Sequence, residues 1–457
     1  MGGDPREQDD TASDPVRIRG GSAVASARGS QGSFRHRLLC LGNGSELDDD
    51  GLILHDPRDG TNSLLRSVYL RTRFAPDDSL PGIYRYSDWL PVSRVLHGSA
   101  TPVTYLSTRL GKLLGLRRLY VTFNGRWDRI GALMPTGTFK DCEAYSVLAR
   151  LPAERGPTLV VASAGNTARA FIEAASANRL PLVAVFPGSA LEGLWLHRDK
   201  SPNVLLVAVS GGADYLDAIR VAELICRLPG FHGEGGARNV ARRDGLGVSV
   251  LGAAEKIGEI PDYYFQAVGS GTGAIAAHEA NLRLNASGLF APKVMRLVVS
   301  QNSPFTPIVE AWNSGSRSLA AGDEAGLRSR IDAIDAKTLS NRNPPYGLRG
   351  GLYDALADSR GEAVAVSNAE ARAARALFQE TEGCDISAEA GVAAASLMKK
   401  AGAGELGRDA LVMLNVTGGG YERLRNDPGA LKPGADLEIG KDEFDPDRFL
   451  EAISHLS

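Results

Sequence analysis

Residues 158–228 constrain the fold most strongly, because short apolar runs alternate there with helix-like stretches. The apolar runs are Thr158–Ala162, Pro181–Phe186 and Val204–Val209, and the helix-like stretches are Thr167–Asn178 and Asp214–Leu228. Strands that are apolar on both faces and separated by helices are typical of a parallel sheet covered on both sides. We therefore predict an α/β fold whose ligands lie beyond the carboxyl ends of the strands, where the loops gather.

The size and charge of the chain exclude several classes of protein. Its 457 residues are enough for two or three domains, and 51 Lys and Arg against 54 Asp and Glu give no sign of nucleic acid or anionic membrane binding. No apolar run reaches the ~18 residues of a membrane helix, and the N-terminus lacks the apolar stretch of a secretory signal. Four scattered cysteines form no metal-ligand pair or disulfide framework, which favours a reducing cytoplasm.

A lysine follows a glycine-containing turn in the segment Pro135–Asp141, and a helix-compatible run, Glu143–Arg150, comes after it. The helix dipole disfavours a cation near the start of a helix. A lysine at such a position is a candidate for chemistry, since a lowered pKa lets the amine form a Schiff base. For Lys140 alone a solvated surface lysine is the simpler interpretation, so the assignment depends on three further segments.

The first of these segments follows the apolar run Thr158–Ala162 and contains Ser163, Ala164, Gly165, Asn166 and Thr167. Small residues at the start of a helix leave backbone N–H groups free, and such a terminus can bind a carboxylate. The hydroxyl and amide side chains could equally be simple helix caps. The segment is therefore a candidate substrate-binding loop only together with the others.

The second segment places three alternate glycines between the apolar run Tyr263–Val268 and the helix-like stretch Ala274–Arg283. The loop consists of Gly269, Ser270, Gly271, Thr272 and Gly273. Glycines let a backbone approach its ligand closely, and N–H donors at a helix start bind phosphate. A dinucleotide site fits less well, because the early βαβ context and the matching acidic residue are missing. We therefore predict a phosphate-binding cradle.

The third segment ends the apolar run Ala410–Val416 with Thr417 and three glycines, Gly418, Gly419 and Gly420. Alone it could be a simple loop. Beside a bound aromatic ring, however, Thr417 would offer a neutral hydroxyl to a pyridine nitrogen.

In this order, the four segments resemble the threonine synthase branch of the fold-type II enzymes that depend on pyridoxal 5'-phosphate (PLP). The resemblance covers residues 81 to about 425. Within the branch the chain is more similar to the cysteate synthases, on segments that include Thr122–Gly125, Gly235–Gly245 and Ser300–Asn302. The lysine segment itself resembles the threonine synthase version, although Cys142 stands where threonine synthases usually have arginine.

The resemblance implies a tryptophan synthase β-like fold of two domains, each with a mostly parallel sheet flanked by helices. Residues 76–144 and 250–457 would form the large PLP-binding domain, and residues 145–249 a small domain that carries the substrate loop. Residues 1–33 are predicted to be a disordered tail. Residues 34–75 resemble a zinc ribbon in which only Cys40 is kept, and Asn43, Asp56 and Asp59 are poor substitutes for thiolates. Since a tetrahedral site needs four competent ligands, we expect no bound metal.

The resemblance also implies a role for each segment. Lys140 would hold PLP as a Schiff base and act as the catalytic base, Asn166 would bind the ring hydroxyl, and Thr417 the ring nitrogen. The phosphate of the cofactor would be held by Gly269, Ser270, Gly271, Thr272 and Gly273, and the substrate carboxylate by Ser163, Ala164, Gly165, Asn166 and Thr167. Arg169, Arg242 and Arg243 are candidates for a second substrate anion, since guanidinium groups match phosphate and sulfonate geometry, but each could be a surface residue.

The reaction implied is a β-replacement in which O-phospho-L-serine and sulfite give L-cysteate and phosphate. Threonine synthesis from O-phosphohomoserine, replacement by another nucleophile and a non-catalytic protein of the same fold all stay open. We expect an amino-acid substrate and an anionic nucleophile as small-molecule partners, a homo-oligomeric assembly, a cytoplasmic location, and no nucleic acid or membrane partner.

Overall fold

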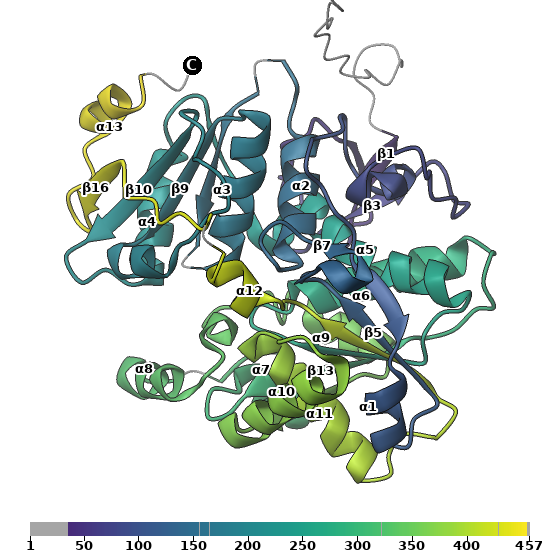
Figure 1. Ribbon diagram of the computed structural model, residues 1–457. Helices are drawn as coiled ribbons and strands as arrows, with labels where there is room; N and C mark the ends of the chain where they lie inside the picture. The colour runs from purple at the N-terminus through teal and green to yellow at the C-terminus, as the bar shows by residue number, and fades with distance from the viewer. Residues whose placement is uncertain (1–34, 155, 164, 321, 428, 455–457) are drawn as a thin grey trace, which may run out of the picture. The chain divides into compact units, whose positions relative to one another are not determined.

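The structure, a computed structural model, describes residues 35–154, 156–163, 165–320, 322–427 and 429–454. The predicted disordered tail, residues 1–33, lies outside these ranges. Two largely parallel sheets and the helices around them make up most of the described chain (Figure 1). The elements outside the large sheets include α1 (Thr108–Leu113), α7 (Pro307–Asn313), α8 (Glu324–Ala333), α9 (Leu352–Asp358), α12 (Tyr421–Arg425), α13 (Pro446–Ala452), β6 (Arg126–Trp127) and β7 (Ala132–Leu133).

One sheet has five parallel strands and contains the apolar runs that the sequence singled out. Its order is β11 (Phe231–Gly233), β8 (Thr158–Ala162), β9 (Leu182–Pro187), β10 (Val204–Ser210) and β16 (Leu437–Gly440). Alternate side chains of β8 pack on opposite faces: Leu159 and Val161 share a core with α3 (Asn166–Asn178), and Val160 shares one with α4 (Tyr215–Ile225). The prediction of a parallel sheet covered on both faces is confirmed.

The other sheet has six strands, and only its edge strand is antiparallel. Its order is β14 (Glu362–Val366), β13 (Arg296–Asn302), β12 (Tyr263–Ala267), β15 (Leu411–Val416), β5 (Arg118–Phe123) and the antiparallel β4 (Val103–Leu106). Helices α10 (Asn368–Glu382) and α11 (Ala388–Gly402) cover one face, and α5 (Val240–Ile257) and α6 (Thr272–Ala286) cover the other. Because β12 and β15 are neighbours, the loops that follow them meet at one edge of the sheet.

Helix α2 (Lys140–Arg150) starts at the predicted lysine and is almost wholly buried. It packs closely on α5, where a Cβ added to Gly245 would lie 2.5 Å from the carbonyl oxygen of Cys142. Cys142 itself is buried, and burial raises the pKa of its thiol. The thiol therefore stays protonated, which agrees with a small core hydrophobe rather than a reactive group.

The zinc-ribbon-like segment forms a small antiparallel sheet of β2 (Glu46–Asp48), β1 (His36–Cys40) and β3 (Leu65–Tyr69). Its acidic residues hold turns: Asp59 accepts hydrogen bonds from the backbone and hydroxyl of Ser63, and Asp56 accepts one from Asn43. Within the described part of the chain, no group of three or more His, Cys, Asp or Glu is placed to bind a metal. The absence of zinc stays a prediction.

The division into two domains also stays a prediction. Strand β16 pairs with β10, so residues 437–440, which the sequence assigned to the large domain, extend the five-stranded sheet. A division drawn by sheets would therefore place this segment with residues 145–249. Separately, none of the helices in the described ranges is both long and apolar enough to cross a membrane.

Candidate active site

The amino group of Lys140 lies in a buried cluster of alternating charges. Its Nζ lies 2.9 Å from Oε2 of Glu143, which is one turn further along α2. The side chain of Glu143 is fully buried. Arg242, on α5, lies 3.3 Å from the other oxygen of Glu143 and donates to Glu234 at 2.6 Å. Lys140, Glu143, Arg242 and Glu234 thus form a continuous chain of ion pairs.

The electrostatics of this cluster favour a reactive amine. Burial lowers the pKa of Lys140, the carboxylate of Glu143 opposes this effect, and the charge of Arg242 lowers the pKa further. A lowered pKa enlarges the neutral fraction of the amine, which is the form that acts as nucleophile and base. Arg242 has the opposite balance: burial alone would lower its pKa, but Glu143 and Glu234 outweigh burial and raise it.

The glycine cradle lies directly against the lysine segment. A Cβ placed on Gly273 would lie 3.0 Å from the ring of Phe139 and 2.5 Å from Nε2 of Gln266. Gly271 has a φ of +78°, and a Cβ there would meet Leu352 at 2.6 Å. An added side chain would clash at both positions, so glycine lets the loop pack closely against Leu352, Gln266 and Phe139.

Further contacts of the cradle lie within it and with the turn at Thr338. Within it, the backbone N–H of Thr272 donates to Oγ of Ser270 at 3.3 Å. Outside it, Thr338 lies beside both glycine loops: a Cβ on Gly269 would lie 2.9 Å from its carbonyl oxygen, and one on Gly165 would lie 3.7 Å from its methyl group. The cradle and the predicted substrate loop therefore border the same turn.

The Thr417 segment is hydrogen-bonded to the lysine segment through the backbone. The N–H of Phe139 donates to the carbonyl of Thr417 at 3.0 Å, and the N–H of Gly419 donates to the carbonyl of Gly137 at 3.0 Å. Thr417 is buried. The structure thus brings together the lysine segment and the Thr417 segment, which lie far apart in the sequence.

The predicted substrate loop leads into α3, which begins at Asn166. Its N-cap, Gly165, makes no side-chain cap hydrogen bond, and Oγ of Ser163 accepts from the backbone of Gly165 at 3.2 Å. Thr167, the second residue of the helix, is half-buried. Backbone N–H groups at this terminus are consequently available to an anion. Ala164 lies outside the described residues.

Of the three candidate arginines, the structure does not bring Arg243 to the site. Its side chain is fully buried and pairs with Glu279 at 3.0 Å, and it also donates to the carbonyls of Leu65 and Ala237. These contacts fix the small N-terminal sheet to α5 and α6, so Arg243 has a structural position. Adjacent arginines on one helix point in different directions, which explains why the sequence could not separate Arg242 from Arg243.

The residue after the lysine, Asp141, is buried and was not among the predicted site residues. It accepts hydrogen bonds from the backbone and the hydroxyl of Thr136, at 2.9 and 2.6 Å. Burial raises its pKa to about 7, although these two hydrogen bonds oppose the shift. Asp141 therefore titrates in the folded protein near neutral pH.

Replacing Asp141 with asparagine should reduce the pH dependence of stability. The pKa of Asp141 is about 7 in the folded chain, above the reference value of 3.8. Its contribution to the free energy of unfolding is therefore complete below about pH 4 and is lost as the pH rises through 7. An asparagine keeps both Thr136 contacts, accepting from the N–H and donating to the hydroxyl. Between pH 5 and 8, the wild type should lose about 3 kcal/mol more unfolding free energy than the variant, at about 1.36 kcal/mol per pKa unit. Urea unfolding at both pH values measures this, and equal losses would contradict the shift.

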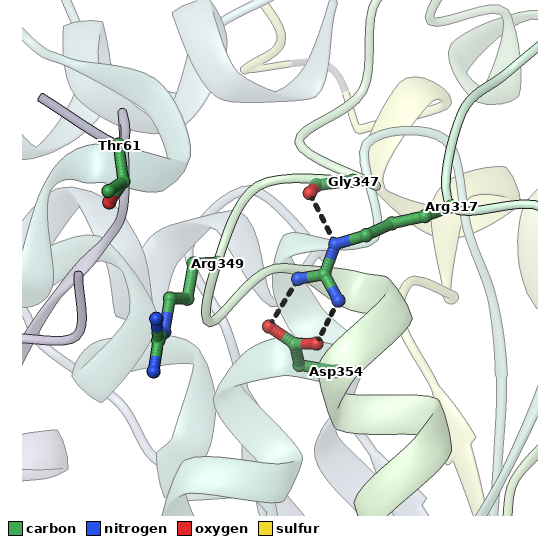
Figure 2. A pocket seen from close by; sticks show the side chains of 5 residues that line it. All are labelled: Thr61, Arg317, Gly347, Arg349 and Asp354. Atoms are coloured by element: carbon green, nitrogen blue, oxygen red, sulfur yellow. Dashed lines mark hydrogen bonds and ion pairs between the residues drawn. The ribbon is translucent and has the colours of Figure 1, made fainter.

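One cavity of the structure is lined by none of the predicted site residues. It has a volume of about 470 Å³ and is lined by Thr61, Arg317, Gly347, Arg349 and Asp354 (Figure 2). Arg317 is already fixed there by Asp354 at 2.7 Å and by the carbonyl of Gly347 at 3.0 Å. It contains none of the candidate catalytic groups, so the candidate active site remains at Lys140.

The sequence of residues 106–418 matches the family described as pyridoxal-phosphate dependent enzyme. Among similar proteins are the cysteate synthases of Methanosarcina acetivorans (44% identical; 86% of this chain and 94% of that protein), Methanoculleus marisnigri (46%; 86% and 90%) and Methanocorpusculum labreanum (43%; 87% and 96%). The matches extend over nearly the whole length of these proteins.

Solved structures with a similar fold include two enzymes of distant sequence. Threonine deaminase isoform 2 from Solanum lycopersicum is 15% identical, with a TM-score of 0.53 over 71% of this chain and 86% of that one. Maize serine racemase is also 15% identical, with a TM-score of 0.53 over 71% and 92%. At this level of identity the likeness concerns the fold alone.

Proposed function

This chain belongs to the family of pyridoxal-phosphate dependent enzymes, and on that premise we propose that it makes L-cysteate and phosphate from O-phospho-L-serine and sulfite. The observation that carries the proposal is the similarity to proteins named cysteate synthase, at 43–46% identity over 86–87% of the chain. The site geometry supports the proposal, because the glycine cradle lies against the lysine segment and borders the same turn as the start of α3.

The residues of the site fit the cofactor. The cradle has no room for side chains at Gly271 and Gly273, which suits the close approach of a phosphate to backbone N–H groups. We assign the cofactor phosphate to Gly269, Ser270, Gly271, Thr272 and Gly273, the covalent link to Lys140, the ring hydroxyl to Asn166 and the ring nitrogen to Thr417. When bound, PLP supplies an electron sink that weakens the bond between Cα and its hydrogen.

The residues of this chain then handle the substrate and its proton. The N–H groups at the start of α3 bind the carboxylate of the amino acid, with Ser163, Gly165, Asn166 and Thr167 around it. Lys140 takes the proton from Cα, and Glu143, 2.9 Å from its Nζ, stabilises the ammonium that results. Arg242 orients Glu143 through its other oxygen rather than binding the substrate, because two carboxylates already neutralise it.

The proposal is tested by comparing two substrates. We expect catalytic efficiency for O-phospho-L-serine with sulfite to exceed that for O-phosphohomoserine by about a hundredfold, because one extra methylene displaces the leaving phosphate by more than about 1 Å. Separate assays of cysteate and threonine, with phosphate release followed in both, give the two values. Threonine formation at the higher efficiency would assign the chain to threonine synthesis instead.

We also infer a cytoplasmic location and a homo-oligomeric assembly for the enzyme. All four cysteines are free, three of them buried, which suits a reducing compartment. Light scattering of the purified chain would test the assembly.

A further inference from the structure

A small cavity lies at the N-terminal end of α3, beside the proposed carboxylate site. It has a volume of about 170 Å³, and its polar lining comes from Ser163, Asn166, Arg169 and Arg425. At about 30 Å³ per water molecule, this volume corresponds to about six waters, which is enough for a phosphate- or sulfite-sized anion. The cavity combines a free helix terminus with two guanidinium groups.

Arg169 is an unusual buried cation, because no carboxylate of the described chain forms an ion pair with it. It is 5% exposed, its Nη2 donates to the carbonyl of Thr136 at 2.6 Å, and its Nε has no hydrogen-bond partner among the described residues. The Cζ atom of its guanidinium lies over two aromatic rings, 3.7 Å from the centroid of Trp195 and 5.3 Å from that of Tyr421. It is therefore held firmly in the cavity wall with donor capacity left over.

Arg425 reaches the same cavity from the end of α12. Its guanidinium lies 5.7 Å from the ring centroid of Tyr421, so two cations border one aromatic ring. The described residues provide no ion-pair partner for it. Burial lowers the pKa of Arg169, Tyr421 and Asp141 oppose this effect, and the charge of Arg425 adds a smaller lowering. Arg425 is exposed whereas Arg169 is buried, so an anion between them would chiefly offset the cost of the buried charge of Arg169.

We propose that the side chains of Arg169 and Arg425, next to the start of α3 that binds the carboxylate, form an anion subsite that holds the substrate phosphate and afterwards sulfite. This subsite rests on the proposed function, and it supplies residues for the second substrate anion, to which no group has yet been assigned. In the reaction the Cβ–O bond breaks, with its electron pair leaving on phosphate. The Cβ–S bond forms from the lone pair of sulfur, and the proton taken from Cα returns to it. Since phosphate leaves from Cβ and sulfite attacks Cβ, one subsite can hold the two anions in turn.

The subsite is tested on the full-length holoenzyme by calorimetric titration with inorganic phosphate. Wild type should bind phosphate, and Arg425→Ala should bind it about tenfold to a hundredfold more weakly, which is the loss of one charge-assisted contact. Arg425→Lys should recover part of the affinity. The control is Arg423→Ala, an exposed arginine on the same short helix that pairs with Asp128 at 3.4 Å, and it should bind phosphate like wild type.

Steady-state kinetics provide a second readout. In Arg425→Ala the KM values for O-phospho-L-serine and sulfite should rise together, while kcat and the visible spectrum of the bound cofactor change little. An unchanged phosphate affinity in Arg425→Ala, or no phosphate binding to wild type, would overturn the subsite. Because the titration needs no turnover, phosphate binding that depends on Arg425 in a protein that makes no cysteate would uphold the subsite and reject the proposed function.

Discussion

Lys140→Ala should abolish stable cofactor binding and lower the rate of the reaction by at least about a thousandfold. The substitution removes the proposed covalent link and the proposed base together, and a positioned base alone contributes about 10²–10⁴. The amine that is lost is the half-buried one whose Nζ lies 2.9 Å from Glu143. Visible absorbance after dialysis measures the cofactor, and an assay of phosphate release measures the rate.

Borohydride reduction followed by peptide mapping locates the link directly. In the wild type the reduced cofactor should be found on Lys140, and in Lys140→Ala no peptide should carry it. The exposed Lys112→Ala is the matched control and should keep both the label and the rate. A label on another lysine, or a variant that keeps wild-type activity, would overturn the assignment of Lys140.

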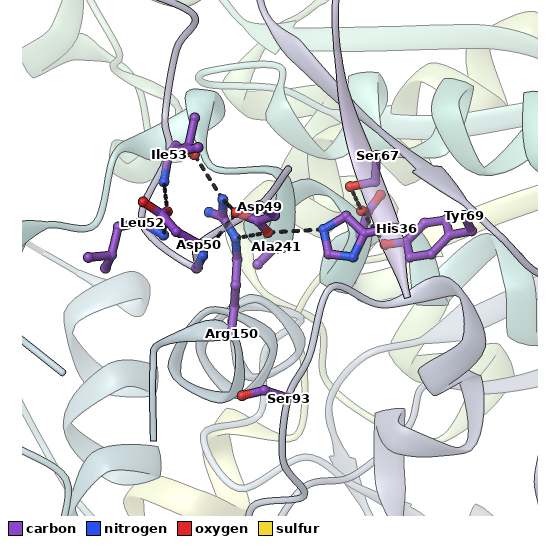
Figure 3. A network of polar contacts seen from close by, with 12 residues as sticks. His36, Asp49, Asp50, Leu52, Ile53, Ser67, Tyr69, Ser93, Arg150 and Ala241 are labelled. Atoms are coloured by element: carbon purple, nitrogen blue, oxygen red, sulfur yellow. Dashed lines mark hydrogen bonds and ion pairs between the residues drawn. The ribbon is translucent and has the colours of Figure 1, made fainter. Parts of the chain in front are cut away.

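The second large effect concerns stability, and we expect Asp49→Asn to destabilise the folded chain by about 3–5 kcal/mol. Asp49 is fully buried and receives Nε and Nη2 of Arg150 at 2.9 and 2.7 Å and Nε2 of His36 at 3.0 Å (Figure 3). Burial alone would raise the pKa of Asp49, but the hydrogen bonds from His36 and Arg150 outweigh it and hold the pKa well below its usual range. An asparagine leaves the charge of Arg150 buried without a counter-charge.

This loss of stability arises where the N-terminal sheet meets helix α2. Arg150 is the last residue of α2 and also donates to Asn239, the N-cap of α5, at 3.0 Å. Urea unfolding measures the loss. The neighbouring Asp48→Asn is the control, since its side chain is 93% exposed, and it should change stability by no more than about 0.5 kcal/mol. Equal effects of the two substitutions would show that the buried pair does not hold this junction.

The elements that surround the active site could be predicted from the sequence because their signals are local. Strand Thr158–Ala162 has the bounds that its apolar run predicted, and α3 and α6 begin within two residues of the predicted starts. The four cofactor segments carry glycines and hydroxyl residues beside strand ends, and parallel strands bring such ends to one edge of a sheet. Periodicity and turn chemistry therefore predicted the α/β class and the candidate segments, whereas the roles of their residues came from the resemblance to the threonine synthase branch.

The partners of the charged residues could not be predicted, because they depend on helix packing between distant segments. The pairing of Glu143 with Lys140 is the exception, because a spacing of three residues on a helix is a local signal. The contacts of Arg242 with Glu143 and of Arg169 with the rings of Trp195 and Tyr421 depend on how distant segments of the chain pack together. The same is true of β16, which has only four residues and is defined by its pairing with β10.

The most direct measurement of the proposed function follows the sulfur atom. The purified chain, loaded with PLP, is incubated with O-phospho-L-serine and isotopically labelled sulfite, and the products are analysed by mass spectrometry together with a phosphate assay. The account predicts labelled L-cysteate in a one-to-one ratio with released phosphate, and neither product from Lys140→Ala. Phosphate release without sulfur in the amino-acid product, or no turnover of O-phospho-L-serine by a protein with bound cofactor, would contradict it.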